Sequence, residues 1–63
     1  MIHLIMSLKP QILIIDDDAH QVNYLTKILE SQYDPIHEDD EWGARETYTR
    51  QSQTIRIVFL NLN

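Results

Sequence analysis

The first half of the chain contains a continuous apolar run, followed by a segment whose apolar residues recur at helical spacing. Residues 12–15 are all apolar, and an uninterrupted run of this kind predicts a strand covered on both faces, as in a parallel sheet. Residues 19–31 predict an α-helix, because their apolar positions form one stripe at helical spacing. Asp18 is placed to cap this helix, and Gln21 completes the pattern of a capping box. The stripe consists of Val22, Leu25, Ile28 and Leu29.

The second half of the chain repeats this alternation of strand and helix. Residues 33–37 predict a short strand, and Pro35 favours an edge position because proline cannot donate a ladder hydrogen bond. The acidic residues 38–41 predict the solvated start of a helix that ends near Gln51. Residues 55–60 are again mostly apolar and predict another buried strand. The order strand, helix, strand, helix, strand predicts an α/β fold with a parallel sheet.

Polar residues follow both of the strongly apolar strands. The first strand is followed by Asp16, Asp17 and Asp18, and the last by Asn61. Ligands of parallel sheets gather beyond the carboxyl ends of the strands. If the two strands are neighbours, Asp16, Asp17 and Asn61 form an oxygen-rich pocket of the kind that suits Mg²⁺. Taken alone, the three aspartates favour helix capping and solvation over a metal site.

These segments together resemble a known family. Residues 12–18 (ILIIDDD), the helix after them and residues 57–62 (IVFLNL) are similar to the N-terminal half of a response-regulator receiver domain of two-component signalling. The 44 positions (61 − 17) between Asp17 and Asn61 fit the layout of that family. The resemblance implies a partial flavodoxin-like fold over residues 11–63, with a short parallel sheet of order 2-1-3 and helices on both faces. Residues 1–10 would form an N-terminal extension.

The resemblance also assigns roles to the residues at the strand ends. Asp17 would be the direct Mg²⁺ ligand, Asp16 would act largely through water, and the backbone carbonyl of Asn63 would complete the metal site. Asn61 occupies the position at which the family has its phosphate-accepting aspartate. An amide lacks the anionic oxygen that attacks phosphorus, so we expect phosphotransfer to fail and Mg²⁺ to bind weakly. Asp18 is better explained as the helix cap.

Composition narrows the remaining function classes. Ten Asp and Glu against five Lys and Arg give a net charge of −5, which argues against binding to nucleic-acid phosphates. The absence of cysteine excludes disulfides, zinc-thiolate sites and thiol catalysis. The first ten residues carry neither a signal-peptide pattern nor a membrane-spanning length. We therefore expect a cytoplasmic protein without a membrane segment, whose biological start is either Met1 or Met6.

Other candidate features favour ordinary structural roles. We interpret His3, His20 and His37 as surface residues, because no partners stand at metal-ligand spacing. Trp42 and Tyr48 are interpreted as core or half-exposed packing residues. The chain has one glycine and therefore no glycine-rich phosphate loop, so it is not expected to be an enzyme. A metal-dependent phosphatase or nucleotidyl-transfer site on Asp16 and Asp18 is the enzymatic alternative.

The expected function is that of a truncated receiver-like domain in a phosphorelay, since the second half of the family's fold would follow Asn63. Its partner would be a histidine kinase or a phosphotransfer protein that contacts residues 19–31. One alternative is a pseudo-receiver interaction module that needs no phosphate and self-associates along the exposed strand 55–60. The other is a gene remnant without a stable fold. A chain this short is expected to be marginally stable as a monomer.

Overall fold

The computed structural model describes residues 9–61, and all five expected elements occur there in the expected order. The first helix ends two residues earlier than expected, because the chain turns back at Leu29, whose carbonyl accepts from the amide of Tyr33 at 2.8 Å. The elements are β1 (Gln11–Asp16), α1 (Ala19–Leu29), β2 (Asp34–Glu38), α2 (Glu41–Gln51) and β3 (Ile55–Asn61).

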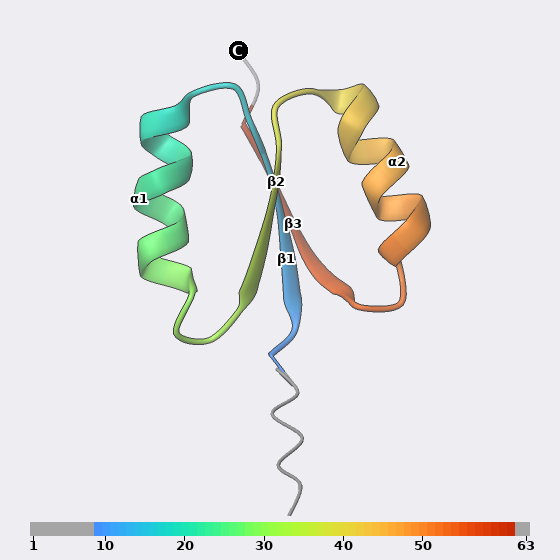
Figure 1. The fold of residues 1–63 in the computed structure, drawn as a ribbon, viewed down its shortest axis with the longest axis horizontal. Helices are drawn as coiled ribbons and strands as arrows, with labels where there is room; N and C mark the ends of the chain where they lie inside the picture. The colour runs from blue at the N-terminus through green and yellow to red at the C-terminus, as the bar shows by residue number, and fades with distance from the viewer. Residues whose placement is uncertain (1–8, 62–63) are drawn as a thin grey trace, which may run out of the picture.

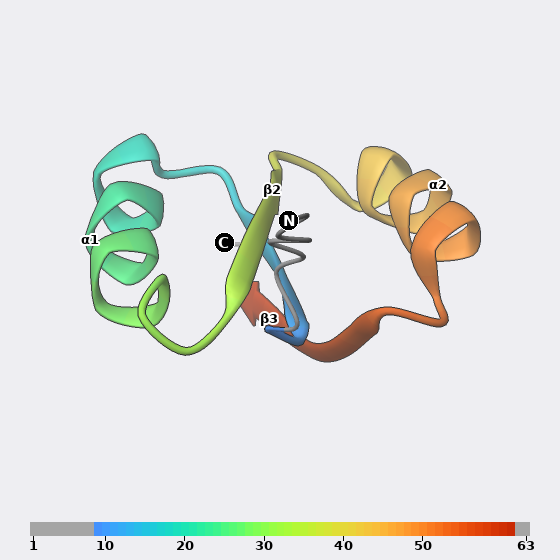
Figure 2. The same cartoon turned by 60° about the horizontal axis from the view of Figure 1, so that its bottom comes forward.

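The three strands form one parallel sheet in the order β2-β1-β3. The predicted order 2-1-3 and the partial flavodoxin-like architecture are thereby confirmed. Figure 1 views the sheet nearly edge-on, with α1 on one face and α2 on the other, and Figure 2 shows the same two-sided arrangement from another angle. The central position of β1 explains its uninterrupted apolar run, since both faces of this strand are covered by a helix.

Alternating side chains of β1 build two small cores, one under each helix. Ile12 and Ile14 face α1, where they pack with Val22 and with the partly buried Phe59. The other two apolar residues of β1 face α2. This second core contains Leu13, Ile15, Ala44 and Ile55, with Ile36 packed against it.

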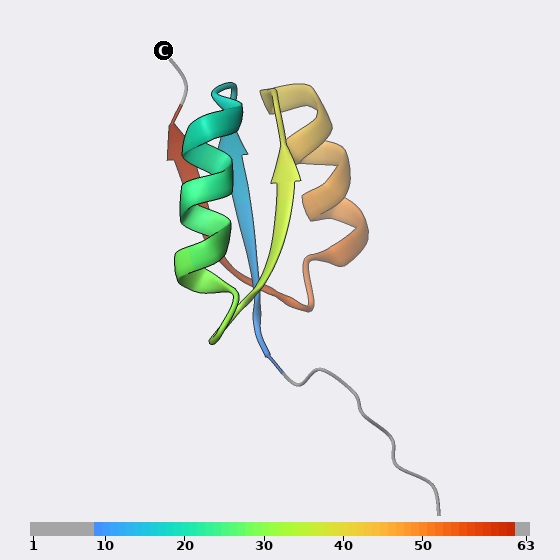
Figure 3. The ribbon, with the colours of Figure 1, turned by 60° about the vertical axis from the view of Figure 1, so that its left-hand side comes forward.

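β3 differs from the strand that the sequence predicted. Of its apolar residues, Ile55 is buried, but Ile57, Val58 and Leu60 are 39%, 47% and 62% exposed. The reason is the placement of the helices, since both pack chiefly over β1 and β2. β3 is also an edge of the sheet, because β1 is its only neighbour in the strand order, and Figure 3 shows it on the side of β1 opposite to β2.

α2 presents small side chains to the sheet. Ala44 and Thr47, three positions apart, are its buried residues, and the Thr47 hydroxyl donates to Oε2 of Glu38 at the end of β2 over 2.6 Å. Trp42 is 73% exposed, so its interpretation as a packing residue was wrong. The physical reason is helical geometry, because a residue two positions before Ala44 lies on a different side of the helix.

Both helices contain 11 residues, whereas a bilayer span requires about 20. Within residues 9–61, neither helix is therefore long and apolar enough to cross a membrane.

Candidate functional site

The carboxyl ends of β1 and β3 place Asp16 beside Asn61. The two residues are partners in the register of the parallel pair, and the Asn61 side-chain amide donates from Nδ2 to Oδ2 of Asp16 over 3.3 Å. Two of the residues singled out in the sequence, 45 positions apart, are thus brought into contact. Adjacency of the two strands in the sheet is what brings them together.

Asp16 is the buried member of this group. Its side chain is 1% exposed, and its Oδ1 accepts from the backbone amide of Asp18 at 2.9 Å. With Oδ2 held by Asn61, each carboxylate oxygen has an N–H donor. Burial of a carboxylate without such partners would be costly. The two hydrogen bonds therefore allow Asp16 to lie at the end of an otherwise apolar strand.

Asp17 and Asp18 have different roles from Asp16 and from each other. Asp17 is exposed in the turn after β1. Asp18 is the N-cap of α1, as predicted, and its Oδ1 accepts from the amides of His20 at 2.9 Å and Gln21 at 3.4 Å. The capping box is only half formed. Its second hydrogen bond would run from the Asp18 backbone amide to the Gln21 side chain, but this amide donates to Asp16 Oδ1 instead.

His37 joins this end of the sheet, which the sequence reasoning did not foresee. Its side chain, 39% exposed, comes from β2, and Nε2 lies 3.0 Å from the backbone carbonyl oxygen of Asp16 and 3.9 Å from Oδ1 of Asp39. A proton on Nε2 lets the imidazole donate to the Asp16 carbonyl. The strand order was the available signal, since β2 ends beside β1 and places its last residues at the same edge.

The side-chain oxygens at this edge are of the kind that binds a hard divalent cation, but their arrangement fits a metal site only in part. Carboxylate and amide oxygens are ligands of Mg²⁺, yet both oxygens of Asp16 already accept hydrogen bonds, and Asn61 presents its nitrogen to Asp16. In residues 9–61, no group of three or more acidic or histidine side chains is arranged to hold a metal ion. Asn63, whose carbonyl was expected to complete the site, lies outside the described residues.

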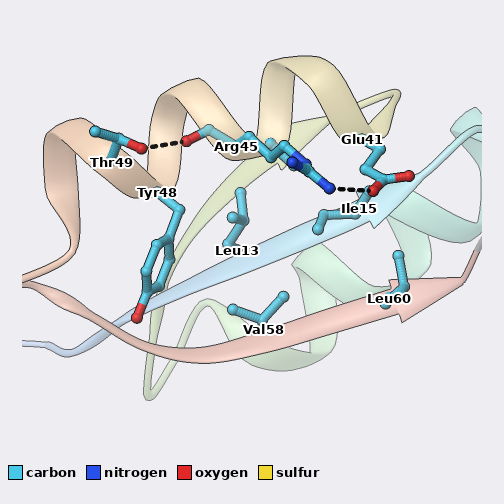
Figure 4. Close-up of a pocket in the computed structure, with 9 residues that line it drawn as sticks. Leu13, Ile15, Glu41, Arg45, Tyr48, Thr49, Val58 and Leu60 are labelled. Carbon is cyan, nitrogen blue, oxygen red and sulfur yellow. Dashed lines mark hydrogen bonds and ion pairs between the residues drawn. The ribbon is translucent and has the colours of Figure 1, made fainter.

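A second hollow lies away from the strand ends, between α2 and β3. It is an open groove of about 630 Å³ with a mainly apolar lining, in which Val58 and Leu60 project from β3 toward α2 and Tyr48 projects from α2 toward β3 (Figure 4). An ion pair stands on its rim, where the Arg45 guanidinium donates to Glu41 Oε1 over 3.0 Å. The sequence signal for this groove was the alternation of Val58 and Leu60, which places both on one face of β3.

Comparison of the chain with protein-family models, with curated proteins and with solved structures gives no match. Functional interpretation therefore depends on the residues and their geometry.

Proposed function

We propose that this chain is a receiver-like signalling module of the two-component type that does not accept a phosphoryl group. The observation that supports this most strongly is the contact between Asp16 and Asn61 at the carboxyl ends of neighbouring parallel strands. In a receiver, these positions hold an acidic residue and the phosphate-accepting aspartate. The sheet order and the capped helix after the acidic turn agree with the same layout.

The side chain of Asn61 makes phosphorylation at this position chemically unfavourable. Its amide has no anionic oxygen to act as a nucleophile, and its nitrogen is turned toward Asp16. In this proposal the chain has no catalytic step of its own. Its signalling role would depend on binding rather than on a covalent phosphoryl group.

We further propose that Mg²⁺ binds weakly, with Asp17 as its direct ligand and with Asp16 acting largely through water. Asn61 lowers the negative charge that would otherwise attract the ion. The Asn61 amide also has to release Asp16 Oδ2 before that oxygen can turn to a metal. Both effects reduce affinity relative to a site with three carboxylates.

The first helix supports a docking role toward a histidine kinase or a phosphotransfer protein. Tyr24 and Ile28, four positions apart on α1, are 64% and 52% exposed. Residues at this spacing are neighbours on a helix surface, so they form an apolar patch on the side of α1 away from the sheet. A partner helix could cover this patch without contact with Asn61. Binding would then be independent of phosphate.

A direct test compares the unchanged chain with Asn61→Asp. Both are treated with a small-molecule phosphodonor and Mg²⁺, and are titrated separately with Mg²⁺ while backbone NMR signals and Trp42 fluorescence are followed. We expect no acyl phosphate on the unchanged chain. We expect Asn61→Asp to bind Mg²⁺ at least about 10-fold more tightly, because a third carboxylate faces the ion.

Asn61→Ala is the matched control, since it removes the amide without adding charge. Any gain in its Mg²⁺ affinity should come only from Asp16 Oδ2, which is freed from its hydrogen bond to Asn61. A phosphorylated unchanged chain would contradict the proposal. Equal Mg²⁺ affinities of Asn61→Asp and Asn61→Ala would contradict the placement of residue 61 in the site.

A further inference from the structure

The free edge of β3 is an uncovered surface with apolar side chains on both of its faces. Ile57 lies on the α1 side, whereas Val58 and Leu60 lie on the α2 side, and all three are at least 39% exposed. β3 pairs with β1 along one edge only, so the backbone groups on its other edge have no strand partner within residues 9–61. Such an edge is a template for another strand.

Charge is distributed unevenly along the direction of this strand. The sequence has ten acidic residues, and seven of them lie at the carboxyl end of the sheet, in the segments 16–18 and 38–41. Four of the five basic residues lie at the opposite end, because each helix runs back toward the start of the strands and ends in a basic turn. These four are Lys9, Lys27, Arg50 and Arg56. Glu30 and Asp34 also lie at this end, so its net charge is 4 − 2 = +2, against a strongly negative carboxyl end.

We propose that the free edge of β3 pairs antiparallel with β3 of a second copy of this chain, around a two-fold axis at Val58. An antiparallel pair places the acidic end of one sheet beside the basic end of the other, whereas a parallel pair would bring the two acidic ends together. The result is a closed dimer with one continuous six-stranded sheet. This inference does not depend on the proposed signalling function.

The sequence of β3 suits this register. With Val58 opposite its own symmetry mate, Ile57 faces Phe59 of the second copy on the α1 side. Arg56 lies at the register shift of β3 and has no partner in β1, and it comes opposite Leu60 of the second copy. Directly opposed apolar pairs stabilise antiparallel strands. The two Arg56 residues stand four positions apart along the strands, about 14 Å, so their repulsion is weak at physiological salt.

The same arrangement extends the floor of the groove between α2 and β3, because the added strand lies beside β3 in the plane of the sheet. Val58 and Leu60 form its floor on the β3 side, and the second copy would place its own Val58 beside them. Arg56 of the second copy would approach Leu60 and the acidic Glu41 on the groove rim. A second copy of this chain therefore offers both an apolar contact for Val58 and an opposite charge for Glu41.

The oligomeric state of the whole chain provides the first test. Sedimentation equilibrium over a concentration series is expected to give a mass that rises from 7.5 kDa toward twice that value. Val58→Lys should weaken the dimer at least about 100-fold, because each copy loses an apolar contact and gains a charge that faces its symmetry mate. Trp42→Lys is the control, since Trp42 is also apolar and 73% exposed but lies on α2, outside the lining of the groove.

A cysteine cross-link tests the register without adding charge, because the chain has no cysteine of its own. Val58→Cys should form a covalent dimer under mild oxidation, since opposed residues of an antiparallel pair lie about 4.5–5.5 Å apart, within disulfide reach. Leu60→Cys should react much more slowly, because the two thiols would be attached to positions about 14 Å apart along the strands.

Three results would overturn the proposal. One is a monomer at every concentration, whether folded, unfolded or with the edge covered by another segment of the same chain. The second is a Val58→Lys chain that dimerises as well as Trp42→Lys, with circular dichroism confirming that both are folded. The third is a Leu60→Cys chain that cross-links as fast as Val58→Cys.

Discussion

Asn61 Nδ2 donates a hydrogen bond over 3.3 Å to Oδ2 of Asp16, a carboxylate that is 1% exposed. A neutral amide thus supplies the N–H donor of a buried carboxylate oxygen. The contact satisfies a buried acceptor at the end of the central strand and also links β3 to β1. Asn61 therefore has a structural role as well as the role in signalling proposed above.

Removal of this amide should destabilise the fold. Asn61→Ala leaves Asp16 Oδ2 without its donor, and we expect the free energy of unfolding to fall by about 1–3 kcal/mol. Urea unfolding at a fixed protein concentration measures the change. Asn23→Ala is the control, since Asn23 is exposed in α1 and its replacement by a better helix former should leave stability unchanged or slightly higher. An equal effect of the two substitutions would show that the Asp16 contact contributes nothing.

Neighbouring aspartates in the turn after β1 should respond differently to the same substitution. The Oδ1 of Asp18 caps α1 by accepting from two backbone amides. Asp18→Ala removes this cap and should lower the free energy of unfolding by about 1 kcal/mol. Asp17→Ala removes an exposed carboxylate from an acidic turn and should leave the unfolding free energy nearly unchanged. Thermal unfolding followed by far-UV circular dichroism distinguishes them. A larger loss for Asp17→Ala would reverse these assignments.

The threonine hydroxyls of α2 should contribute unequally to stability. Thr47 is 2% exposed and donates to Glu38 Oε2 at 2.6 Å, so Thr47→Val should lower the free energy of unfolding by about 1–3 kcal/mol. Thr49 is exposed and donates to the Arg45 carbonyl within its own helix at 2.8 Å. Thr49→Val should therefore change stability little. Denaturant titration of both variants gives the comparison, and equal losses would contradict it.

The effect of Gly43→Ala on the free energy of unfolding should depend on the residue at position 38, being destabilising with Glu38 and stabilising in a Glu38→Ala background. A Cβ at Gly43 would lie 2.5 Å from Oε1 of Glu38, whose carboxylate is held by Thr47, so the single substitution should be destabilising. In a Glu38→Ala background the space is free, and the same substitution should stabilise α2 by about 1 kcal/mol, the difference in helix propensity between glycine and alanine. A double-mutant cycle measures both effects. The same sign in both backgrounds would show that Glu38 does not limit this position.

The sequence predicted much of the candidate site because strand ends in a parallel sheet follow simple rules. A run of four apolar residues followed by three aspartates located the end of β1, and the adjacency of β1 and β3 placed Asp16 next to Asn61. Which aspartate is buried, which is exposed and which caps α1 depends on the conformation of the turn after β1. It is the direction of this turn that leaves Asp17 exposed and lets the Asp18 amide donate to Asp16.

His37 and the groove were not predicted, for a related reason. The sequence shows which residues have a polar or apolar side chain, but not how far a neighbouring helix extends across the sheet. His37 reaches the Asp16 carbonyl because β2 lies directly beside β1. The groove exists because α2 packs on β1 and β2 and stops short of β3.

The sequence by itself determined the number, type and order of the elements, since hydrophobic period, capping residues and strand length are local properties. It also predicted that both faces of β1 are covered, because an uninterrupted apolar run is typical of such a strand. The exposure of Val58 and Leu60 was decided by the tertiary structure. An apolar run is compatible with a buried or an edge strand, and only the packing of the helices over β1 and β2 distinguishes the two.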